Sequence, residues 1–534
     1  MATAVPRWTP RAETTKREDK LLVRTAKTRK LFAFLRLHRT QLFNEPFQRE
    51  LEAMYRDTGE GQQPVAPALM AMVLLLQAYE GVSDAEAVER TVVDARWQMV
   101  LDVLGSEEPA FGQGTLQAFR ERLIDHDMDR RLLERTVELA KQTSAFDWKK
   151  LPGTLRLAVD SRPLTGAGKV EDTINLLGHA AKKLLGAAAA LVGREAKTLA
   201  KKSGAPLLAE GSIKKNLDVD WSDRVQKKAA LQNLLEQIEA LEEWVRKHLP
   251  EQAARPPLSE HLATLKKLRE QDLEPDPTDP SGRKQQIRQG VTEDRQISIE
   301  EPEMRHGRKS KSRTINGYKA HLGVDLSTQL VVACAVTPAN RPEAEALGPI
   351  IADVKSYPER AVVGELHIDR GYLAAQQTHE LAANDTEIIS KPWSPSNGEQ
   401  FSKKDFLIDL KKKQITCPAG HREPLQLGKA VHFNAAACAV CPLRAKCTTG
   451  AAERGRTVLI AHDEPLQQEL RAAASTPSGR QRLRERVTIE HRLAHLARKQ
   501  GNRARYKGVR KNLMDLRRYA AVLNLENTAL ANAA

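Results

Sequence analysis

The sequence predicts an α/β protein in which helical segments precede, interrupt and follow a sheet-containing core. Residues 153–160 alternate between apolar and polar side chains, with Leu155, Leu157 and Val159 on one side, and this period of two is typical of a strand. Further strands are predicted at 318–325, 330–337 and 361–369, and a helix is predicted at 342–354. Strands that alternate with a helix indicate an α/β sheet.

Residues 1–150 carry the signals of short helices joined by turns. Ser83 and Glu86 form the pattern of a capping box, and the segment 112–115 precedes a second helical run. Short helices with glycine-containing turns are compatible with a helix-turn-helix DNA binder and equally with a helical bundle. The pattern alone does not separate these two interpretations.

The middle of the chain interrupts the strands with a long helical stretch. Residues 172–270 are predicted to be helical, and within them 225–249 has apolar residues at helical spacing, as in an amphipathic helix pair or a short coiled coil. Residues 271–304 are rich in Pro, Asp, Gly and Gln and are predicted to be a linker. Helix is predicted again at 476–526.

The charge of the chain favours a polyanionic partner. The 534 residues carry a net charge of +15, which points to nucleic acid more than to a membrane surface. Residues 480–518 hold fourteen Lys and Arg against three acids, or +11, and residues 1–40 hold eleven against three, or +8. No apolar run reaches the roughly 18 residues of a membrane span, and five cysteines do not make a disulfide scaffold. We therefore expect a cytoplasmic protein.

Three widely separated acids have informative surroundings. Asp160 and Asp369 end apolar, strand-like runs, and Glu490 lies on an arginine-rich helix with Arg486 four residues before it, on the same face. Carboxylates are the ligands that Mg²⁺ prefers, and two such ions can clamp both reacting oxygens of a phosphodiester. Each acid alone would be a surface residue or a helix cap. The rival acid on the sheet, Asp325, is interpreted as a turn residue at a strand end.

Four sequence segments together carry a resemblance to a known family. They are Leu-Ala-Val-Asp-Ser around Asp160, Gly-Tyr-Lys-Ala-His at 317–321, Asp-Arg-Gly-Tyr at 369–372 and Arg-Val-Thr-Ile-Glu at 486–490. The chain resembles the DDE transposases of bacterial insertion sequences. In that family's third motif a tyrosine precedes the arginine and a lysine follows the glutamate, whereas this chain has Leu483 and Ala497 at those positions. The acidic triad is intact, but a role that requires the tyrosine is not implied.

The resemblance implies a ribonuclease-H-like catalytic core split by a helical insertion and a cysteine-rich insertion, preceded by an all-helical N-terminal domain. It implies two Mg²⁺ or Mn²⁺ ions, with Asp160 bridging them and Asp369 and Glu490 each completing one side. The partner would be double-stranded DNA with terminal inverted repeats, bound by a homodimer in the bacterial cytoplasm and associated with the nucleoid.

Alternatives are a domesticated DNA-binding regulator and a metal-dependent nuclease without strand transfer. The expected regions are an N-terminal DNA-binding domain (1–150), the first catalytic strand (151–170), the helical insertion with its linker (171–310), the core (311–395), the cysteine-rich insertion (396–475) and the C-terminal catalytic and basic helices (476–534).

A cysteine cluster predicts a structural zinc site in the second insertion. Cys417, Cys438, Cys441 and Cys447 fall within a short stretch of an otherwise cysteine-poor chain, and Cys-x2-Cys lets one turn supply two thiolates. His421 or His432 could replace one thiolate, and packed thiols or an iron–sulfur cluster are the alternatives. Cys334 is predicted to be a core residue.

The predicted DNA contacts are Arg486, Arg498, Lys499, Arg503, Arg505, Lys507, Arg510 and Lys511.

Overall fold

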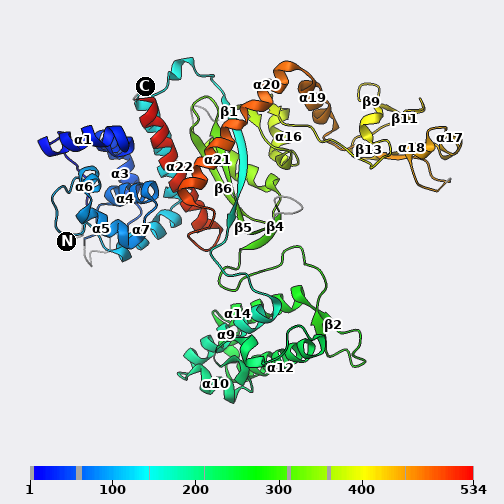
Figure 1. The fold of residues 1–534 in the computed structure, drawn as a ribbon, viewed down its shortest axis with the longest axis horizontal. Helices are drawn as coiled ribbons and strands as arrows, with labels where there is room; N and C mark the ends of the chain where they lie inside the picture. Colours follow the sequence, from blue (N-terminus) through cyan, green and yellow to red (C-terminus); the bar gives the residue numbers. More distant parts are fainter. Residues whose placement is uncertain are drawn as a thin grey trace.

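The computed structural model arranges the chain as a central α/β body with three attachments (Figure 1). The N-terminal helices lie against one side of the body, a helical insertion extends below it, and the cysteine-rich segment lies at the far end. The structure describes residues 5–55, 63–143, 145–209, 211–308, 314–357, 362–451 and 453–532.

The central body is built on one six-stranded mixed sheet. Its strand order is β4-β5-β1-β7-β8, with β6 also paired to β5. β1 runs antiparallel to β5 and parallel to β7. The predicted α/β sheet is therefore confirmed. The strands are β1 (Leu155–Thr165), β4 (Arg305–Arg308), β5 (Thr314–Asp325), β6 (Val331–Pro338), β7 (Val363–His367) and β8 (Glu387–Ile389).

Two strand boundaries differ from the sequence prediction. Asp160 does not end its strand, because β1 continues to Thr165 and the extension pairs with β5. β7 ends at His367, two residues before Asp369, which instead precedes a short 3-10 turn, η4 (Arg370–Tyr372). The predicted start of that strand at residue 361 lies outside the described residues. Asp325 forms the β5–β6 turn as expected, since its carboxylate accepts hydrogen bonds from the Ser327 amide and the Thr328 hydroxyl.

The N-terminal helices share a hydrophobic core with the sheet and with the last helix. α4 is buried along nearly its whole length, and α22 packs against α4, α8 and β6. One cluster of buried apolar residues contains members of the N-terminal helices, β5, β6 and α22. The predicted capping box is present, with Ser83 and Glu86 exchanging hydrogen bonds at the start of α5. These helices are α1 (Lys16–Thr28), α2 (Lys30–Leu42), α3 (Glu45–Glu52), α4 (Pro67–Glu80), α5 (Asp84–Val93), α6 (Ala95–Leu101), α7 (Gln113–Asp125), α8 (Met128–Gln142) and α22 (Val509–Ala531).

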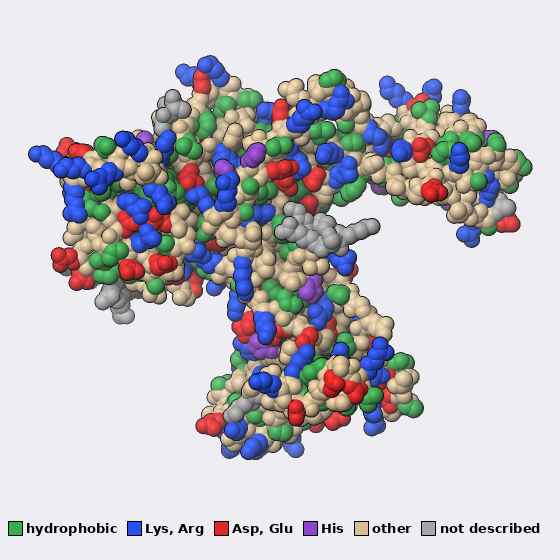
Figure 2. Space-filling view, viewed as in Figure 1, with side chains coloured by type: hydrophobic (Ala, Val, Ile, Leu, Met, Phe, Trp, Pro, Cys, Tyr) green, Lys and Arg blue, Asp and Glu red, His purple; other side chains and the backbone are tan. Residues whose placement is uncertain are grey.

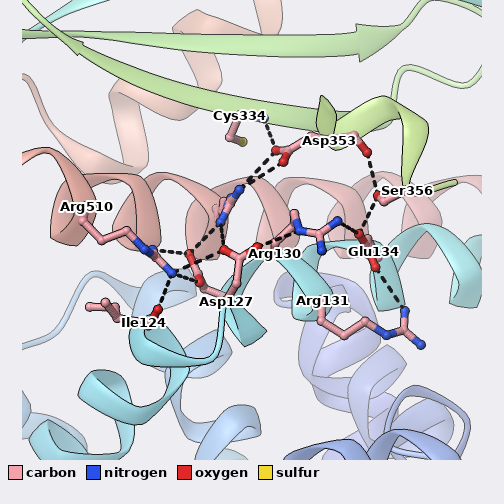
Figure 3. A network of polar contacts seen from close by, with 11 residues as sticks. Ile124, Asp127, Arg130, Arg131, Glu134, Cys334, Asp353, Ser356 and Arg510 are labelled. Carbon is pink, nitrogen blue, oxygen red and sulfur yellow. Dashed lines mark hydrogen bonds and ion pairs between the residues drawn. The ribbon is translucent and has the colours of Figure 1, made fainter. Parts of the chain in front are cut away.

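A buried network of ions ties the same parts together (Figure 3). Arg517 of α22 pairs with Asp129 of α8 at 3.2 Å and with Asp353 of α15 (Leu347–Lys355) at 3.1 Å. Arg510 pairs with Asp129 at 2.6 Å and with Asp127 at 3.4 Å. The N-terminal helices are thus attached to the core by charge as well as by apolar packing.

The helical insertion has a hydrophobic core of its own. Apolar side chains of its helices form a separate buried cluster, which confirms the predicted amphipathic pattern. The segment predicted to be a linker is ordered, however. Ile297 and Met304 in it are fully buried against the central body, and Glu301 accepts hydrogen bonds from Tyr318 and the Gly168 amide. Its elements are α9 (Thr173–Leu191), α10 (Ala196–Lys202), α11 (Ile213–Leu217), α12 (Arg224–His248), α13 (Pro250–Ala253), α14 (Leu258–Asp272), β2 (Leu273–Pro275) and β3 (Gln285–Ile287).

The cysteine-rich segment consists of short strands and short helices around a small apolar cluster. It contains β9 (Leu407–Asp409), β10 (Gln414–Thr416), β11 (Arg422–Pro424), β12 (Ala430–His432), α17 (Ala435–Ala439), α18 (Arg444–Cys447) and β13 (Thr457–Leu459). The chain returns to the sheet through α19 (Glu464–Ser475), α20 (Pro477–Glu485) and α21 (Val487–Gln500). Within the described part of the chain, no single helix is long and apolar enough to span a membrane. Two pairs of consecutive helices, each sharply bent at the break, have that length and apolarity only when the two helices are counted together.

Candidate active site

The three predicted acids line one cleft of about 870 Å³. Asp160 comes from β1, Asp369 from the segment after β7, and Glu490 from α21. The parallel pairing of β1 and β7 sets Ala158 opposite His367. Asp160 and Asp369, each two residues further along the sequence, therefore come to lie side by side. Segments more than a hundred residues apart in the sequence therefore meet at one place.

Arg486 lies among the three carboxylates. Its guanidinium is 3.1 Å from Asp160, 3.3 Å from Glu490 and 3.9 Å from Asp369. Its position just before α21, one turn ahead of Glu490, allows both contacts with the sheet and with its own helix. A single cationic group is thus surrounded by all three acids.

Asp160 is the most buried acid of the three, with 16% of its side chain exposed against 49% for Asp369 and 54% for Glu490. Burial raises its pKa to about 6, and the negative charges of Asp369 and Glu343 act in the same direction. The Ser161 amide, which donates to the Asp160 carboxylate at 2.7 Å, and the charge of Arg486 oppose this rise. An added cation would favour the ionised carboxylate.

Glu343 is a fourth carboxylate in the cleft, and the sequence reasoning missed it. It lies in η3 (Glu343–Ala346), and its carboxylate accepts a 2.5 Å hydrogen bond from the Ser161 hydroxyl, next to Asp160. A Cβ at Gly371 would lie only 2.3 Å from the other carboxylate oxygen of Glu343. The glycine of the Asp-Arg-Gly-Tyr segment therefore leaves space for Glu343, a spatial relation that the sequence alone does not show.

Two of the quoted sequence segments support each other beneath the cleft. His321 of β5 and Tyr372 of η4 share a 2.7 Å hydrogen bond, and the other ring nitrogen of His321 contacts the Thr337 hydroxyl at 3.0 Å. Burial lowers the pKa of His321 to about 3, so its ring is neutral. The pair joins β5 to the segment that carries Asp369.

A second cluster of charges docks α20 on the sheet. Arg156 of β1 pairs with Glu365 of β7 and with Glu485 of α20, and Arg482 also reaches Glu365. His367 contacts the same Glu365 carboxylate at 3.0 Å. The side chains come from both strands that position the acids and from the helix just before Arg486. This cluster fixes where α21 begins.

The donor set in the cleft is suited to a hard divalent cation. Carboxylate oxygens open to a cleft are the ligands of Mg²⁺ and Mn²⁺, and Asp160, Asp369 and Glu490 already surround the cationic Arg486. The three are not drawn tightly together: among the described residues, the ligand atoms that all lie within 4.8 Å of one another belong to Glu365, His367 and Glu485. That second group has Arg156 as its cation.

The four clustered cysteines line one small pocket of about 100 Å³. The Cys417 amide donates to the His421 carbonyl at 2.9 Å, and the Cys441 amide to the Cys438 carbonyl at 3.4 Å, so tight turns present the thiols. Their sulfur atoms do not form a group within 4.8 Å. His421 also lines the pocket, whereas His432 contacts Thr457. Cys334 is buried in β6, as predicted.

The predicted DNA-binding cations lie in different surroundings. Arg503 and Arg505 donate to backbone carbonyls of Ala167 and of 81–82, and Lys507 pairs with Glu300. Arg510 belongs to the buried ion network described above. Lys511 is exposed at the start of α22, and Arg498 and Lys499 lie on α21 away from the cleft. Of the eight predicted DNA-contacting residues, Arg486 lies among the three acids of the cleft.

Comparison with known proteins gives two family matches. Residues 24–122 match a transposase domain, DUF772, and residues 416–529 match a transposase DDE domain, which includes Glu490 and the cysteine cluster. No curated protein and no solved structure matches the chain. The two matches, at opposite ends of the chain, support a DDE-type transposase.

Proposed function

We propose that this chain binds the ends of an insertion sequence and catalyses metal-dependent DNA cleavage and strand transfer. The observation that carries the proposal is the meeting of Asp160, Asp369 and Glu490 around Arg486 in one cleft. The matches to two transposase domains support the same class of reaction. The DNA would carry terminal inverted repeats and would be bound by a homodimer.

The sheet supports a ribonuclease-H-like core as the scaffold of this site. Taken along the sheet, β6, β5, β1, β7 and β8 follow one another, with β5 antiparallel to β1 and β7 parallel to it. The helical insertion would split this core between β1 and β5, and the cysteine-rich insertion between β8 and α21. Asp160 then lies in β1, and Asp369 follows the end of the neighbouring strand β7.

The residues of the cleft divide the work of the reaction. Asp160, Asp369 and Glu490 would hold two Mg²⁺ or Mn²⁺ ions, which when bound activate the attacking oxygen and stabilise charge on the phosphodiester. Arg486, released from the carboxylates by metal, would contact a phosphate of the DNA. The Ser161 amide donates to Asp160, and Glu343 would hold Ser161 in place by accepting a hydrogen bond from its hydroxyl.

The cysteine-rich segment would hold one structural Zn²⁺ through Cys417, Cys438, Cys441 and Cys447. All four line one pocket, and four thiolates leave no open coordination position for a substrate. So short a segment has little apolar core, so metal binding would contribute directly to its folding.

The proposal is tested with purified protein and the inverted repeats that flank its gene. We expect cleavage at the repeat ends and joined products with target DNA in the presence of Mg²⁺. Binding without cleavage would indicate a DNA-binding regulator. Cleavage without joined products would indicate a nuclease without strand transfer.

A further inference from the structure

A second groove lies on the face of α21 that is turned away from the candidate active site. It measures about 670 Å³ and is bounded by α21, the C-terminal end of α22 and the adjoining ends of α2 and α4. Along α21, Glu490, Ala494 and Ala497 line the catalytic cleft, whereas His491, His495 and Arg498 line the groove. At 3.6 residues per turn, these two sets point to different sides of the helix. The groove is therefore a separate site.

The groove is strongly cationic. Lys30, Arg492, Arg498 and Lys499 line it, with Glu526 as the single acid in its wall, and Lys499 already pairs with Glu526 at 2.9 Å. Figure 2 shows Lys, Arg and His side chains gathered on the viewed face over α21 and α22. The exposed side chains of Lys30 and Arg498 form no ion pair with any residue that the structure describes. These charges are unneutralised and face solvent.

The start of α2 adds backbone polarity to the same groove. Lys30 is the first residue of this 13-residue helix, and no side chain caps its N-terminus. The dipole of a helix start favours a bound anion. A helix start, two arginines, two lysines and two histidines thus line one groove.

We propose that this groove binds the phosphate backbone of a duplex DNA segment other than the one in the catalytic cleft. The proposal rests on the proposed function, since it assumes that DNA is the partner. From Arg492 to Lys499 the arginine and lysine side chains of α21 that line the groove span about 10 Å of helix, the length of about three steps along a DNA strand. A row of cations of this length suits successive phosphates, and phosphate contacts position a duplex without reading its sequence. A duplex here would lie one helix width from the acids.

A charge-reversal pair tests the groove directly. Lys30→Glu combined with Arg498→Glu removes both unpaired cations, and Lys201→Glu combined with Lys202→Glu makes the same charge change on the exposed end of α10. Residues 171–304 hold 21 Lys and Arg against 23 Asp and Glu, so the control lies in a region without excess positive charge. Duplex binding is measured by fluorescence anisotropy across a salt series. We expect the groove variant to lose at least about tenfold in affinity and about two units of salt slope, and the control to match the unaltered protein.

A photocrosslink locates the bound duplex. p-Benzoylphenylalanine at His495 should crosslink to DNA, also when Asp160→Asn removes catalysis, and the same probe at the exposed Val225 of α12 should not. If the unaltered protein cleaves its DNA ends, yet the groove variant keeps full affinity and salt slope and His495 gives no crosslink, the groove proposal fails alone. If the unaltered protein binds no duplex at all, both proposals fail. Thermal unfolding of each variant verifies that the fold is intact.

Discussion

At the scale of single residues, the candidate site is a set of charges held at some cost to stability. Asp160 is buried beside Asp369 and Glu343, and only Arg486 and the Ser161 amide favour its charge. A raised pKa for a carboxylate means that folding favours the protonated form.

Replacing Asp160 should stabilise the metal-free protein at neutral pH. The folded pKa of Asp160 is about 6 against an ordinary value of 3.8, so the ionised group destabilises the fold progressively as the pH rises from about 4 through 6. A difference of about two units corresponds to about 3 kcal/mol. Asp160→Asn should therefore unfold at a higher temperature than the unaltered protein at pH 7.5 in EDTA, and at nearly the same temperature at pH 4. A variant that is less stable at pH 7.5 would contradict this account of the site.

Gly371 should be needed because of Glu343. In Gly371→Ala the new Cβ would lie 2.3 Å from a Glu343 carboxylate oxygen and would displace it. We expect a fall of about 10- to 100-fold in the DNA cleavage rate, since a shift of about 1 Å near the reacting groups can cost that much. Gly186→Ala, where a Cβ meets nothing within 4 Å, is the matched control.

The effects of Gly371→Ala and Glu343→Ala on the cleavage rate should not be additive if the glycine acts through Glu343. Glu343→Ala alone and Glu343→Ala with Gly371→Ala should then cleave at the same reduced rate. A Gly371→Ala protein that cleaves at the rate of the Gly186→Ala control would refute the role given to Glu343.

At the scale of elements, the site depends on how helices are seated on the sheet. The parallel pair β1 and β7 places two acids, and α21 places the third. The charges between Arg156, Glu365, Arg482 and Glu485 fix α20 on these same strands. The cysteine-rich segment is a separate small unit with its own apolar cluster. Loss of that unit should leave the sheet folded.

Zinc should be confined to this unit. We expect one Zn²⁺ per chain in protein purified without a His-tag, measured by elemental analysis, and a loss of zinc in Cys441→Ser. Cys334→Ala changes a buried cysteine of β6 and should keep the full zinc content. A chelator should make residues 410–450 sensitive to protease and leave the rest protected, because metal binding contributes to folding of the segment. Zinc well below one per chain, with all four thiols titrating in the native protein, would reject the site.

At the scale of the whole molecule, the first and last parts of the chain form one body with the sheet. A shared apolar cluster and the ion pairs of Arg517 connect the N-terminal helices, α15 and α22. The helical insertion, in contrast, has its own buried cluster. DNA bound by the N-terminal helices would thus be held at a fixed place relative to the acids.

Removing the charge of Arg517 should test this attachment. Arg517→Met removes the arginine that pairs with the buried Asp353 and leaves Asp129 paired with Arg510 alone, and breaking a buried ion pair in this way costs about 3–5 kcal/mol. The free energy of unfolding, measured with denaturant, should fall by this order. Arg484→Met, on the exposed side of α20, should change it by less than about 0.5 kcal/mol. Equal stabilities of the two variants would show that apolar packing alone joins the parts.

The strands, the helical segments and the meeting of the three acids could be predicted from the sequence, because they depend on local periodicity and on residues at recognisable positions. Glu343 could not, since its importance arises from space left by Gly371 and from Ser161, which are distant in the chain. The order of residues 271–304 was missed because a few buried anchors, such as Ile297 and Met304, outweigh a polar composition. The engagement of Arg505 and Arg510 within the protein likewise depends on tertiary partners.

The central claim is that Asp160, Asp369 and Glu490 bind the catalytic metal ions, and metal rescue of a cysteine variant tests it most directly. Mg²⁺ requires hard oxygen ligands, whereas Mn²⁺ accepts a sulfur ligand more readily. Asp369→Cys should bind DNA ends normally, fail to cleave them with Mg²⁺ and regain cleavage with Mn²⁺, while Asp369→Ala should stay inactive with both. Cleavage by Asp369→Cys at the unaltered rate with Mg²⁺, or equal inactivity of the two variants with Mn²⁺, would contradict the claim.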